Sequence, residues 1–223
     1  MNAENIILGV DIDNTLLKQV HHFLSYIKEH IDPSFTYERW NKWDVLDHFP
    51  EHHEKLIGFL KSYFSPENRP NMVIMDHAAE FLSHFNKENI YYITARSTFL
   101  FKDPVGETEE LLELLGAPLA DDHLLLQRNP ASGVKKCKSI IAKENHVDLF
   151  LEDNPENAKK IATYCPVLLI DYPFNRHMKE SNIIRIGAFD DTTGEWKKNP
   201  WKDALEMLDS GKLQRIIGSA RLG

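Results

Sequence analysis

The chain has 223 residues, of which 42% are hydrophobic and 27% are charged, and its formal net charge is −8. These fractions are ordinary for a globular protein and exclude the disordered and fibrous classes. The mild excess of acidic residues offers no basic surface for duplex nucleic acid, so we expect no nucleic-acid partner.

The first residues lack the basic start of a signal peptide, and the longest apolar runs, such as 6–10, are too short to span a bilayer. Cys137 and Cys165 do not form a disulfide framework and are interpreted as small buried side chains. We therefore expect a soluble cytoplasmic protein without a membrane partner. The sequence leaves the oligomeric state open, a homodimer included.

Short apolar runs alternate with helix-like stretches along most of the chain. Runs of this kind are typical of parallel strands that are buried on both faces. The expected strands are 6–10, 90–93, 124–126, 147–151, 167–170 and 183–186. The expected helices are 77–87, 107–115, 135–145, 155–163 and 201–210. This alternation predicts an α/β protein with a doubly wound parallel sheet.

The first connection between strands is much longer than the others. A crossover needs only a dozen or more residues, yet the second strand begins at Ile90. A structureless loop of this length is implausible in a compact domain. We therefore predict a helical cap subdomain at 18–75, inserted after the first strand into a core made of 1–17 and 76–223. The helices expected in the insert are 19–30, 36–41 and 51–63.

Two carboxylates directly follow the first expected strand. Asp11 and Asp13 stand in the pattern Asp-x-Asp-x-Thr, at the sheet edge where open α/β sheets bind their ligands. Like charges this close need a cation or hydrogen-bond donors, and oxygen ligands suit Mg²⁺. The alternative is a helix cap or an Asx-turn. The pair, unlike a single aspartate, favours a functional site.

Further polar residues follow the later strands. Thr94, Ala95 and Arg96 come after the second strand, where a hydroxyl and a guanidinium can both bind phosphate. Lys135 and Lys136 open the helix expected at 135–145, and a lysine there can neutralise phosphoryl charge. The sequence does not decide between the two lysines. Lys136 is preferred because this choice places the apolar side chains of the expected helix on its packed face more naturally.

Glu152 and Asp153 follow the fourth strand, and Asp153 is a candidate third metal ligand. The adjacent pairs His21–His22 and His52–His53 lack the spacing of metal ligands and are interpreted as solvated or partly packed side chains.

Taken in chain order, these segments resemble the haloacid dehalogenase (HAD) superfamily of phosphohydrolases, and the insert resembles the cap that some members carry after the first motif. Finer features are similar to the cytosolic 5′(3′)-deoxyribonucleotidase branch. They are Trp43-Asp44, Thr108-Glu109, the run 153–157 and the run 171–176.

The resemblance implies a mechanism. Asp11 would be the nucleophile that forms an aspartyl-phosphate, and Asp13 would be the general acid and then the general base, with a raised pKa. The lysine, with Lys136 preferred, would balance charge on Asp11 and the phosphoryl group. Thr94 would hold a phosphoryl oxygen.

The resemblance also implies the ligands. Ala95 and Arg96 would bind the phosphate together with the threonine before them. Mg²⁺ would lie between the Asp11 carboxylate, the backbone carbonyl of Asp13, and Asp153. The expected partner is therefore a small phosphorylated metabolite.

The expected function is Mg²⁺-dependent hydrolysis of phosphomonoesters, with nucleoside (deoxy)monophosphates as the first candidate substrates. Glu152 and the Ala95-Arg96 pair depart from the branch and leave the nucleoside open. The alternatives are a phosphatase for another small metabolite, such as a sugar phosphate, and a non-catalytic phosphate-binding protein. A receiver-type phosphoacceptor is disfavoured, because here the lysine precedes the last acidic residue.

The aromatic-rich insert would select the rest of the substrate. Trp40, Trp43 and Phe49 are the candidates for a pocket wall, where a base could stack. The alternative, favoured for most of the aromatic residues, is that they form the insert's own core.

Overall fold

The computed structural model describes residues 3–128 and 133–221. Its main sheet has six parallel strands in the order β3-β2-β1-β4-β5-β6. The strands are β1 Leu8–Val10, β2 Ile90–Thr94, β3 Leu124–Leu126, β4 Leu149–Glu152, β5 Val167–Ile170 and β6 Ile183–Ile186. A short antiparallel pair, β7 Ala188–Phe189 and β8 Trp196–Lys198, follows. The expected doubly wound α/β fold is confirmed.

The central strand β1 is fully buried and pairs with β2 on one side and β4 on the other. Its middle residue, Gly9, lies opposite Phe150 in the register. A Cβ at Gly9 would come within 2.4 Å of the Phe150 ring. Glycine is therefore required here by the close approach of a core aromatic ring.

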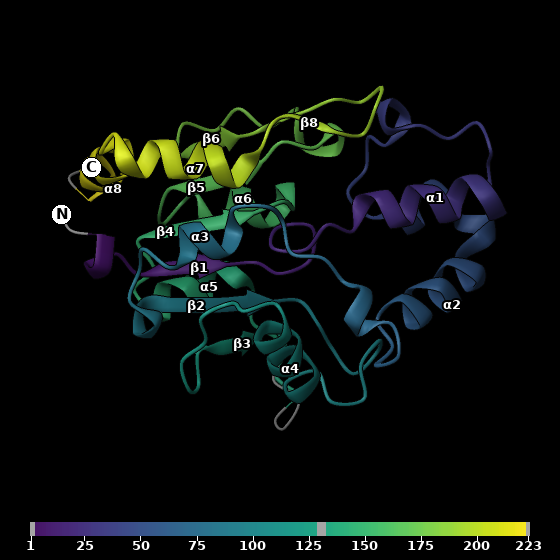
Figure 1. Ribbon diagram of the computed structural model, residues 1–223, viewed down its shortest axis with the longest axis horizontal. Helices are drawn as coiled ribbons and strands as arrows, with labels where there is room; N and C mark the ends of the chain where they lie inside the picture. The colour runs from purple at the N-terminus through teal and green to yellow at the C-terminus, as the bar shows by residue number, and fades with distance from the viewer. Residues whose placement is uncertain (1–2, 129–132, 222–223) are drawn as a thin grey trace.

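Helices cover both faces of the sheet (Figure 1). On one face α5 and α6 pack against each other and against β2, β4 and β5. On the other face α7 contacts α3, α8 and β6. The helices of the core are α3 Ala78–Leu82, α4 Gly106–Leu114, α5 Lys138–Glu144, α6 Pro155–Ile161, α7 Pro200–Asp209 and α8 Lys212–Ala220.

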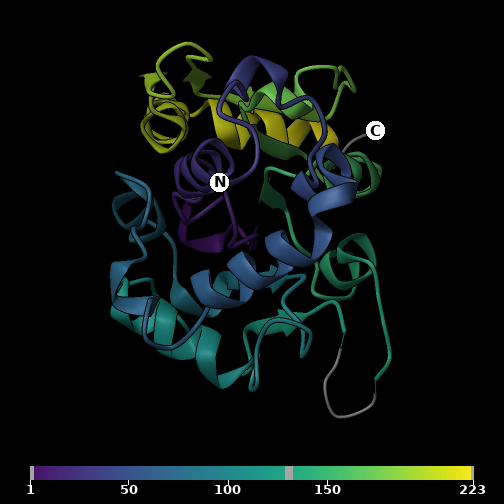
Figure 2. The same cartoon turned by 90° about the vertical axis from the view of Figure 1, so that its right-hand side faces the viewer.

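The long connection after β1 holds α1 Val20–His30 and α2 His53–Tyr63, with short 3-10 helices between and after them. Both helices lie to one side of the sheet, away from the two termini (Figure 1). In the view turned by 90° they lie in front of the core (Figure 2). Aromatic contacts hold this part together, for example Phe23 against Tyr63 at 5.4 Å between ring centroids.

The chain enters and leaves this region through one paired crossing. Leu17 and Ile74 form an antiparallel bridge. The amide of Lys18 donates to the Val73 carbonyl at 2.9 Å, and the amide of Met75 donates to the Leu16 carbonyl at 2.8 Å. The crossing lies at the expected limits of the insert, although the division into a core and a cap subdomain stays a prediction.

The structure departs from the expected helices at several places. The helix expected at 77–87 ends at Leu82, and the segment 36–41 forms only a 3-10 turn, Tyr37–Arg39. Helix α8 and the β7–β8 pair were not expected. The helix expected at 135–145 begins only at Lys138, after the N-cap residue Cys137. No helix of the described residues is long and apolar enough to cross a membrane.

Candidate active site

Three buried carboxylates meet at the carboxyl ends of β1 and β4. Asp11 follows β1, Glu152 ends β4 and Asp153 comes next. One carboxylate oxygen from each lies within 4.8 Å of the others. The strands are parallel neighbours with Val10 opposite Leu151, so the residues that follow them emerge side by side. The structure therefore brings Asp11 and Asp153 together, as the sequence predicted.

The lysine beside this cluster is Lys138. Its Nζ lies 2.6 Å from Oδ1 of Asp11 and 2.9 Å from Oε2 of Glu152, and its side chain is 2% exposed. The two carboxylates outweigh the effect of burial, which opposes ionisation, and raise the pKa of Lys138. Lys138 therefore stays charged.

The expectation that Lys136 takes this position is wrong. The Nζ of Lys136 pairs instead with Glu144 at 2.8 Å, and the side chain is 47% exposed. The reason is the start of α5: Cys137 is the extended N-cap residue, and Lys138 is the first helical residue. Sequence reasoning missed that the helix begins at Lys138, after the N-cap residue Cys137. Lys135 is exposed and, with Arg128, lines a neighbouring hollow that shares Ala95 with the cavity described below.

Glu152 and Asp153 differ in how their oxygens are used. Oε2 of Glu152 accepts from Lys138, and Oε1 accepts from the backbone amides of Asp153 and Asn154 at 3.2 and 3.1 Å. Both oxygens of Glu152 are therefore occupied by protein donors. Oδ2 of Asp153 accepts from the indole Nε1 of Trp43 at 2.9 Å, whereas its Oδ1 is buried without a partner.

The charge balance of the cluster is unfavourable for its carboxylates. Burial first, then the neighbouring charges of Glu152 and Asp13, outweigh Lys138 and raise the pKa of Asp11 to about 8. Burial and the charges of Glu152 and Asp11 likewise raise the pKa of Asp153 well above its ordinary value. The cluster has one lysine for three carboxylates, and the unpartnered Oδ1 of Asp153 offers a hard oxygen ligand. These residues fit a divalent cation such as Mg²⁺.

Asp13 lies in a different environment. Arg96 donates to both of its carboxylate oxygens, Nε to Oδ2 at 3.1 Å and Nη2 to Oδ1 at 2.8 Å, and Nε2 of Gln19 donates to Oδ1 at 2.8 Å. Burial opposes ionisation, but these charged and polar donors together lower the pKa of Asp13. The expected rise in the pKa of Asp13 is therefore wrong for the free site, because sequence reasoning did not foresee the ion pair with Arg96.

Arg96 is itself firmly held. Its guanidinium lies 5.6 Å from the ring centroid of Phe64 and 5.0 Å from that of Phe101, and its Nη1 donates to the hydroxyl of Thr108 at 3.3 Å. Its own backbone amide donates to Oγ1 of Thr94 at 3.3 Å. Thr94 ends β2 and is fully buried. The segment after β2 therefore presents a rigid guanidinium towards Asp13.

A cavity of about 300 Å³ opens above these groups. Asp11, Asp13, Arg96 and Lys138 form its polar side, and Ala95 also lines the cavity. The rest of its wall includes a set of aromatic rings, namely Phe23, Trp40, Trp43, Phe64, Phe99 and Phe101.

Two of the three aromatic residues predicted for the pocket wall lie there, and the third does not. Trp40 and Trp43 line the cavity as predicted, whereas Phe49 packs against Phe35 at 5.0 Å between ring centroids. The Nδ1 of His21 is hydrogen-bonded to the hydroxyl of Tyr37 at 2.7 Å, so the first histidine of the His21–His22 pair is partly packed. No histidine among the described residues joins the acidic cluster or the cavity wall.

Comparison with known protein families identifies the family of this chain. Residues 5–193 match the family described as 5′ nucleotidase, deoxy (pyrimidine), cytosolic type C protein (NT5C). The chain belongs to the NT5C family. It is therefore a HAD superfamily protein, and the matched range contains the insert, both acid-bearing loops and the segment 171–176.

Two curated bacterial relatives of this NT5C protein have similar length. "Putative nucleotidase YqfW" of Bacillus subtilis (strain 168) is 27% identical over 92% of this chain and 94% of its own. "Putative nucleotidase BH1399" of Halalkalibacterium halodurans is 24% identical over 90% of this chain and 91% of its own.

Solved HAD structures also show similarity to this NT5C chain. A HAD family hydrolase from Deinococcus radiodurans R1, with bound phosphate and sodium, covers 77% of this chain and 85% of its own, with a TM-score of 0.46 and 14% identity. A HAD-superfamily hydrolase of subfamily IA from Geobacter sulfurreducens PCA covers 83% of this chain and 93% of its own, with a TM-score of 0.44 and 15% identity.

Proposed function

We propose that this protein is a Mg²⁺-dependent phosphomonoesterase that removes phosphate from nucleoside (deoxy)monophosphates through an aspartyl-phosphate intermediate. The observation that carries the proposal is the buried cluster of Asp11, Lys138 and Asp153, of which Asp11 and Lys138 line the polar side of a cavity with aromatic rings in its wall. Membership of the NT5C family supports the same reaction.

Asp11 is the proposed nucleophile. An oxygen of its carboxylate attacks phosphorus, a new O–P bond forms, and the bond from phosphorus to the leaving oxygen breaks. Charge repulsion between a carboxylate and a phosphate dianion is the main obstacle, and the Lys138 ammonium at 2.6 Å offsets it. The covalent intermediate divides one difficult displacement into two easier ones.

The ion pair of Asp13 with Arg96 would have to open before Asp13 acts as an acid or a base. A phosphate that enters the cavity would compete with the Asp13 carboxylate for the Arg96 guanidinium, because both are anions suited to its planar fork. Asp13, once released from Arg96, would take up a proton from solvent and then donate it to the leaving oxygen. It would then take a proton from the water that hydrolyses the aspartyl-phosphate. Thr94 and the backbone of Ala95 would hold phosphoryl oxygens.

Asp11, Asp153 and the backbone carbonyl of Asp13 are the groups proposed to hold Mg²⁺. When bound, the ion would add its positive charge to that of Lys138 and lessen the repulsion between the Asp11 carboxylate and the phosphate. Glu152 is not assigned to the ion, because both of its oxygens are already bonded to protein donors. Glu152 instead holds Lys138.

The cavity supports a nucleotide more than a sugar phosphate. Its wall is mainly apolar and includes rings such as Phe23, Trp40 and Phe101, on which a base can stack. Several hydroxyl groups of a sugar would meet this mainly apolar wall and lose hydrogen bonds to water, which costs binding free energy. A base with one ribose or deoxyribose places fewer such groups there.

Release of phosphate from a panel of substrates tests this function. The panel contains nucleoside 5′- and 3′-monophosphates, their deoxy forms, p-nitrophenyl phosphate and sugar phosphates. We expect turnover that EDTA abolishes and Mg²⁺ restores, with nucleotides preferred. Activity that survives EDTA would contradict the metal assignment, and preference for sugar phosphates would contradict the substrate. Phosphate binding without any turnover would favour a non-catalytic binding protein.

A further inference from the structure

The segment 171–176 follows β5 and touches the backbone of both acid-bearing loops. It was singled out in the sequence, but the proposed reaction assigns it no task. We infer that the 171–176 segment positions the metal-binding carboxylates Asp11 and Asp153, with Tyr172 and Asn175 as the positioning residues. The inference rests on the proposed function in that these carboxylates are the ones assigned to the metal.

Asn175 is bonded directly to the Asp153 loop. Its side-chain amide Nδ2 donates to the backbone carbonyl of Asp153 at 2.8 Å and to that of Ile170 at 2.8 Å. Asn175 is completely buried. A single amide group therefore ties the residue after β4 to the last residue of β5. No strand pairing reaches Asp153, because the β4–β5 pairing ends at Glu152.

The orientation of the Asn175 amide is fixed by Arg185. The Nη1 of Arg185 lies 2.6 Å from Oδ1 of Asn175, and its Nη2 donates to the backbone carbonyl of the same residue at 2.9 Å. A guanidinium can only donate, so the atom facing it must be the amide oxygen, and the amide nitrogen must face the two carbonyls.

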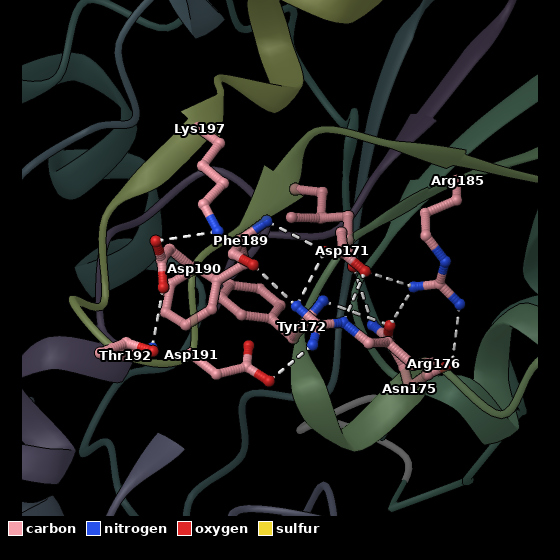
Figure 3. Close-up of polar contacts among 11 residues, drawn as sticks. Asp171, Tyr172, Asn175, Arg176, Arg185, Phe189, Asp190, Asp191, Thr192 and Lys197 are labelled. Carbon is pink, nitrogen blue, oxygen red and sulfur yellow. Dashed lines mark hydrogen bonds and ion pairs between the residues drawn. The ribbon is translucent and has the colours of Figure 1, made fainter. Parts of the chain in front are cut away.

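An ion-pair network surrounds this arrangement (Figure 3). The Asp171 carboxylate accepts from Arg185 at 3.1 Å, from Arg176 at 3.1 and 3.2 Å, and from the amide of Phe189 at 2.9 Å. Arg176 also reaches Asp191 at 2.6 Å. The segment is thereby attached to β6 and to the β7–β8 pair, which gives it a rigid support.

Tyr172 is bonded to the other acid-bearing loop. Its hydroxyl donates to the backbone carbonyl of Asn14 at 3.1 Å. Asn14 follows Asp13 and has a positive φ of 59°, a conformation that a non-glycine residue adopts at some cost. The carbonyl of the next residue, Thr15, accepts from the indole of Trp201 at 3.0 Å. Two buried aromatic donors therefore hold the strained turn that follows Asp11.

The ring of Tyr172 cannot easily move away from this contact. It stacks on Phe174 at 5.1 Å between centroids and meets Trp196 edge-on at 5.4 Å. The residue is 2% exposed. Because one short segment holds both loops, it fixes the separation of Asp11 and Asp153 before any ion binds. Residues that orient metal ligands in this way typically change metal affinity by about 10- to 100-fold when substituted.

Hydrogen exchange of the metal-free protein is the first test. Tyr172→Phe removes one hydroxyl, and Asn175→Asp removes the amide donor. The control Tyr92→Phe removes another tyrosine hydroxyl that donates to a carbonyl, that of Pro118 at 3.0 Å. The control Asn182→Asp removes an amide that donates to the Ala162 carbonyl at 3.0 Å.

We expect Tyr172→Phe to accelerate exchange in the peptide 11–17, and Asn175→Asp to do so in 150–157. Neither control should change these peptides. Exchange that is unaltered in both peptides for Tyr172→Phe and Asn175→Asp would overturn the inference, and so would an equal acceleration by the controls. If Asn175→Asp does not fold, Tyr172→Phe decides the result alone.

Metal affinity is the second test and uses calorimetric titration with Mg²⁺ or Mn²⁺ in the absence of substrate. We expect Tyr172→Phe to bind the ion about 10-fold more weakly, and its phosphatase activity to recover at raised Mg²⁺. Tyr92→Phe should bind like the wild type. Wild-type affinity in Tyr172→Phe would contradict the inference. A wild-type protein that binds no ion would contradict the proposed function instead, and the exchange result would still decide the positioning role.

Discussion

The indole Nε1 of Trp43 donates to Oδ2 of Asp153 at 2.9 Å, although the two residues are 110 positions apart in the sequence. Trp43 belongs to the inserted region and Asp153 to the core, so one hydrogen bond joins the cavity wall to a proposed metal ligand. The other oxygen of the same carboxylate is buried and unpartnered. Trp43 therefore leaves one oxygen of Asp153 for a cation and orients it.

Trp43→Phe should weaken metal binding. The substitution keeps an aromatic wall but removes the donor to a buried carboxylate, so Asp153 loses the partner that fixes its orientation. We expect Mg²⁺ affinity to fall by about 10-fold, measured by titration without substrate. The matched control is Trp40→Phe, because the Nε1 of Trp40 is buried without a partner and its loss removes no hydrogen bond. Equal losses in both variants would contradict this role.

Lys138→Ala should strongly slow turnover, while Lys136→Ala should leave it unchanged. Lys138 is the cation between Asp11 and Glu152, and loss of one such group typically costs about 100- to 1,000-fold in rate. It also leaves two buried carboxylates without their partner, which costs about 3–5 kcal/mol of stability. The exposed pair of Lys136 with Glu144 contributes at most about 1 kcal/mol.

Initial rates and thermal unfolding of the two lysine variants separate these effects. Lys138→Arg serves as a second variant, because it keeps the positive charge but places a larger, planar donor in this buried position. A full loss of rate in Lys136→Ala, with normal rates in Lys138→Ala, would restore the assignment that the sequence alone favoured.

Asp11→Asn should stabilise the metal-free protein while it removes activity. The folded pKa of Asp11, about 8, lies above its ordinary value of 3.8, so the folded state binds the proton more tightly than the unfolded state does. Stability from this group is therefore complete below about pH 4 and is lost as the pH rises through about 8. An amide carries no charge and removes this dependence.

Thermal unfolding in EDTA at pH 6 and pH 8 measures the effect of Asp11→Asn. Between pH 6 and pH 8 the wild type should lose more stability than Asp11→Asn. Mg²⁺ added in excess of the EDTA should stabilise the wild type more at pH 8 than at pH 6. The same slope in both proteins would show that Asp11 is not the group responsible.

The sheet was predictable from the sequence because its strands are continuous apolar runs, and a strand such as Val167–Ile170 can only be buried on both faces. The meeting of Asp11 and Asp153 followed from the same rule, since parallel neighbouring strands end at one edge. Lys138 could not be chosen with the same certainty, because its place depends on the residue at which α5 begins, and helix ends are poorly specified by local sequence.

The environment of Asp13 was beyond the sequence for a different reason. Its pKa depends on a guanidinium 83 residues away, and Arg96 reaches it only because Phe64, Phe101 and Thr108 hold that side chain in place. The contact of Trp43 with Asp153 is of the same kind. Side-chain contacts between the inserted region and the core depend on packing that no local pattern encodes.

Gly9→Ala should destabilise the fold and Gly58→Ala should stabilise it. A Cβ at Gly9 would meet Cδ2 of the fully buried Phe150 ring at 2.4 Å, and the crowding of such a core typically costs about 1–3 kcal/mol. Gly58 lies on the exposed side of α2, and a methyl group there would have nothing within 4 Å. Alanine at this position should therefore add about 0.5–1 kcal/mol through its better helix propensity. Denaturant unfolding of both variants measures the two changes. An unchanged free energy of unfolding in Gly9→Ala would mean that the Phe150 ring can shift to make room for the methyl group. The close approach of β1 to β4 beneath Asp11 would then not depend on glycine.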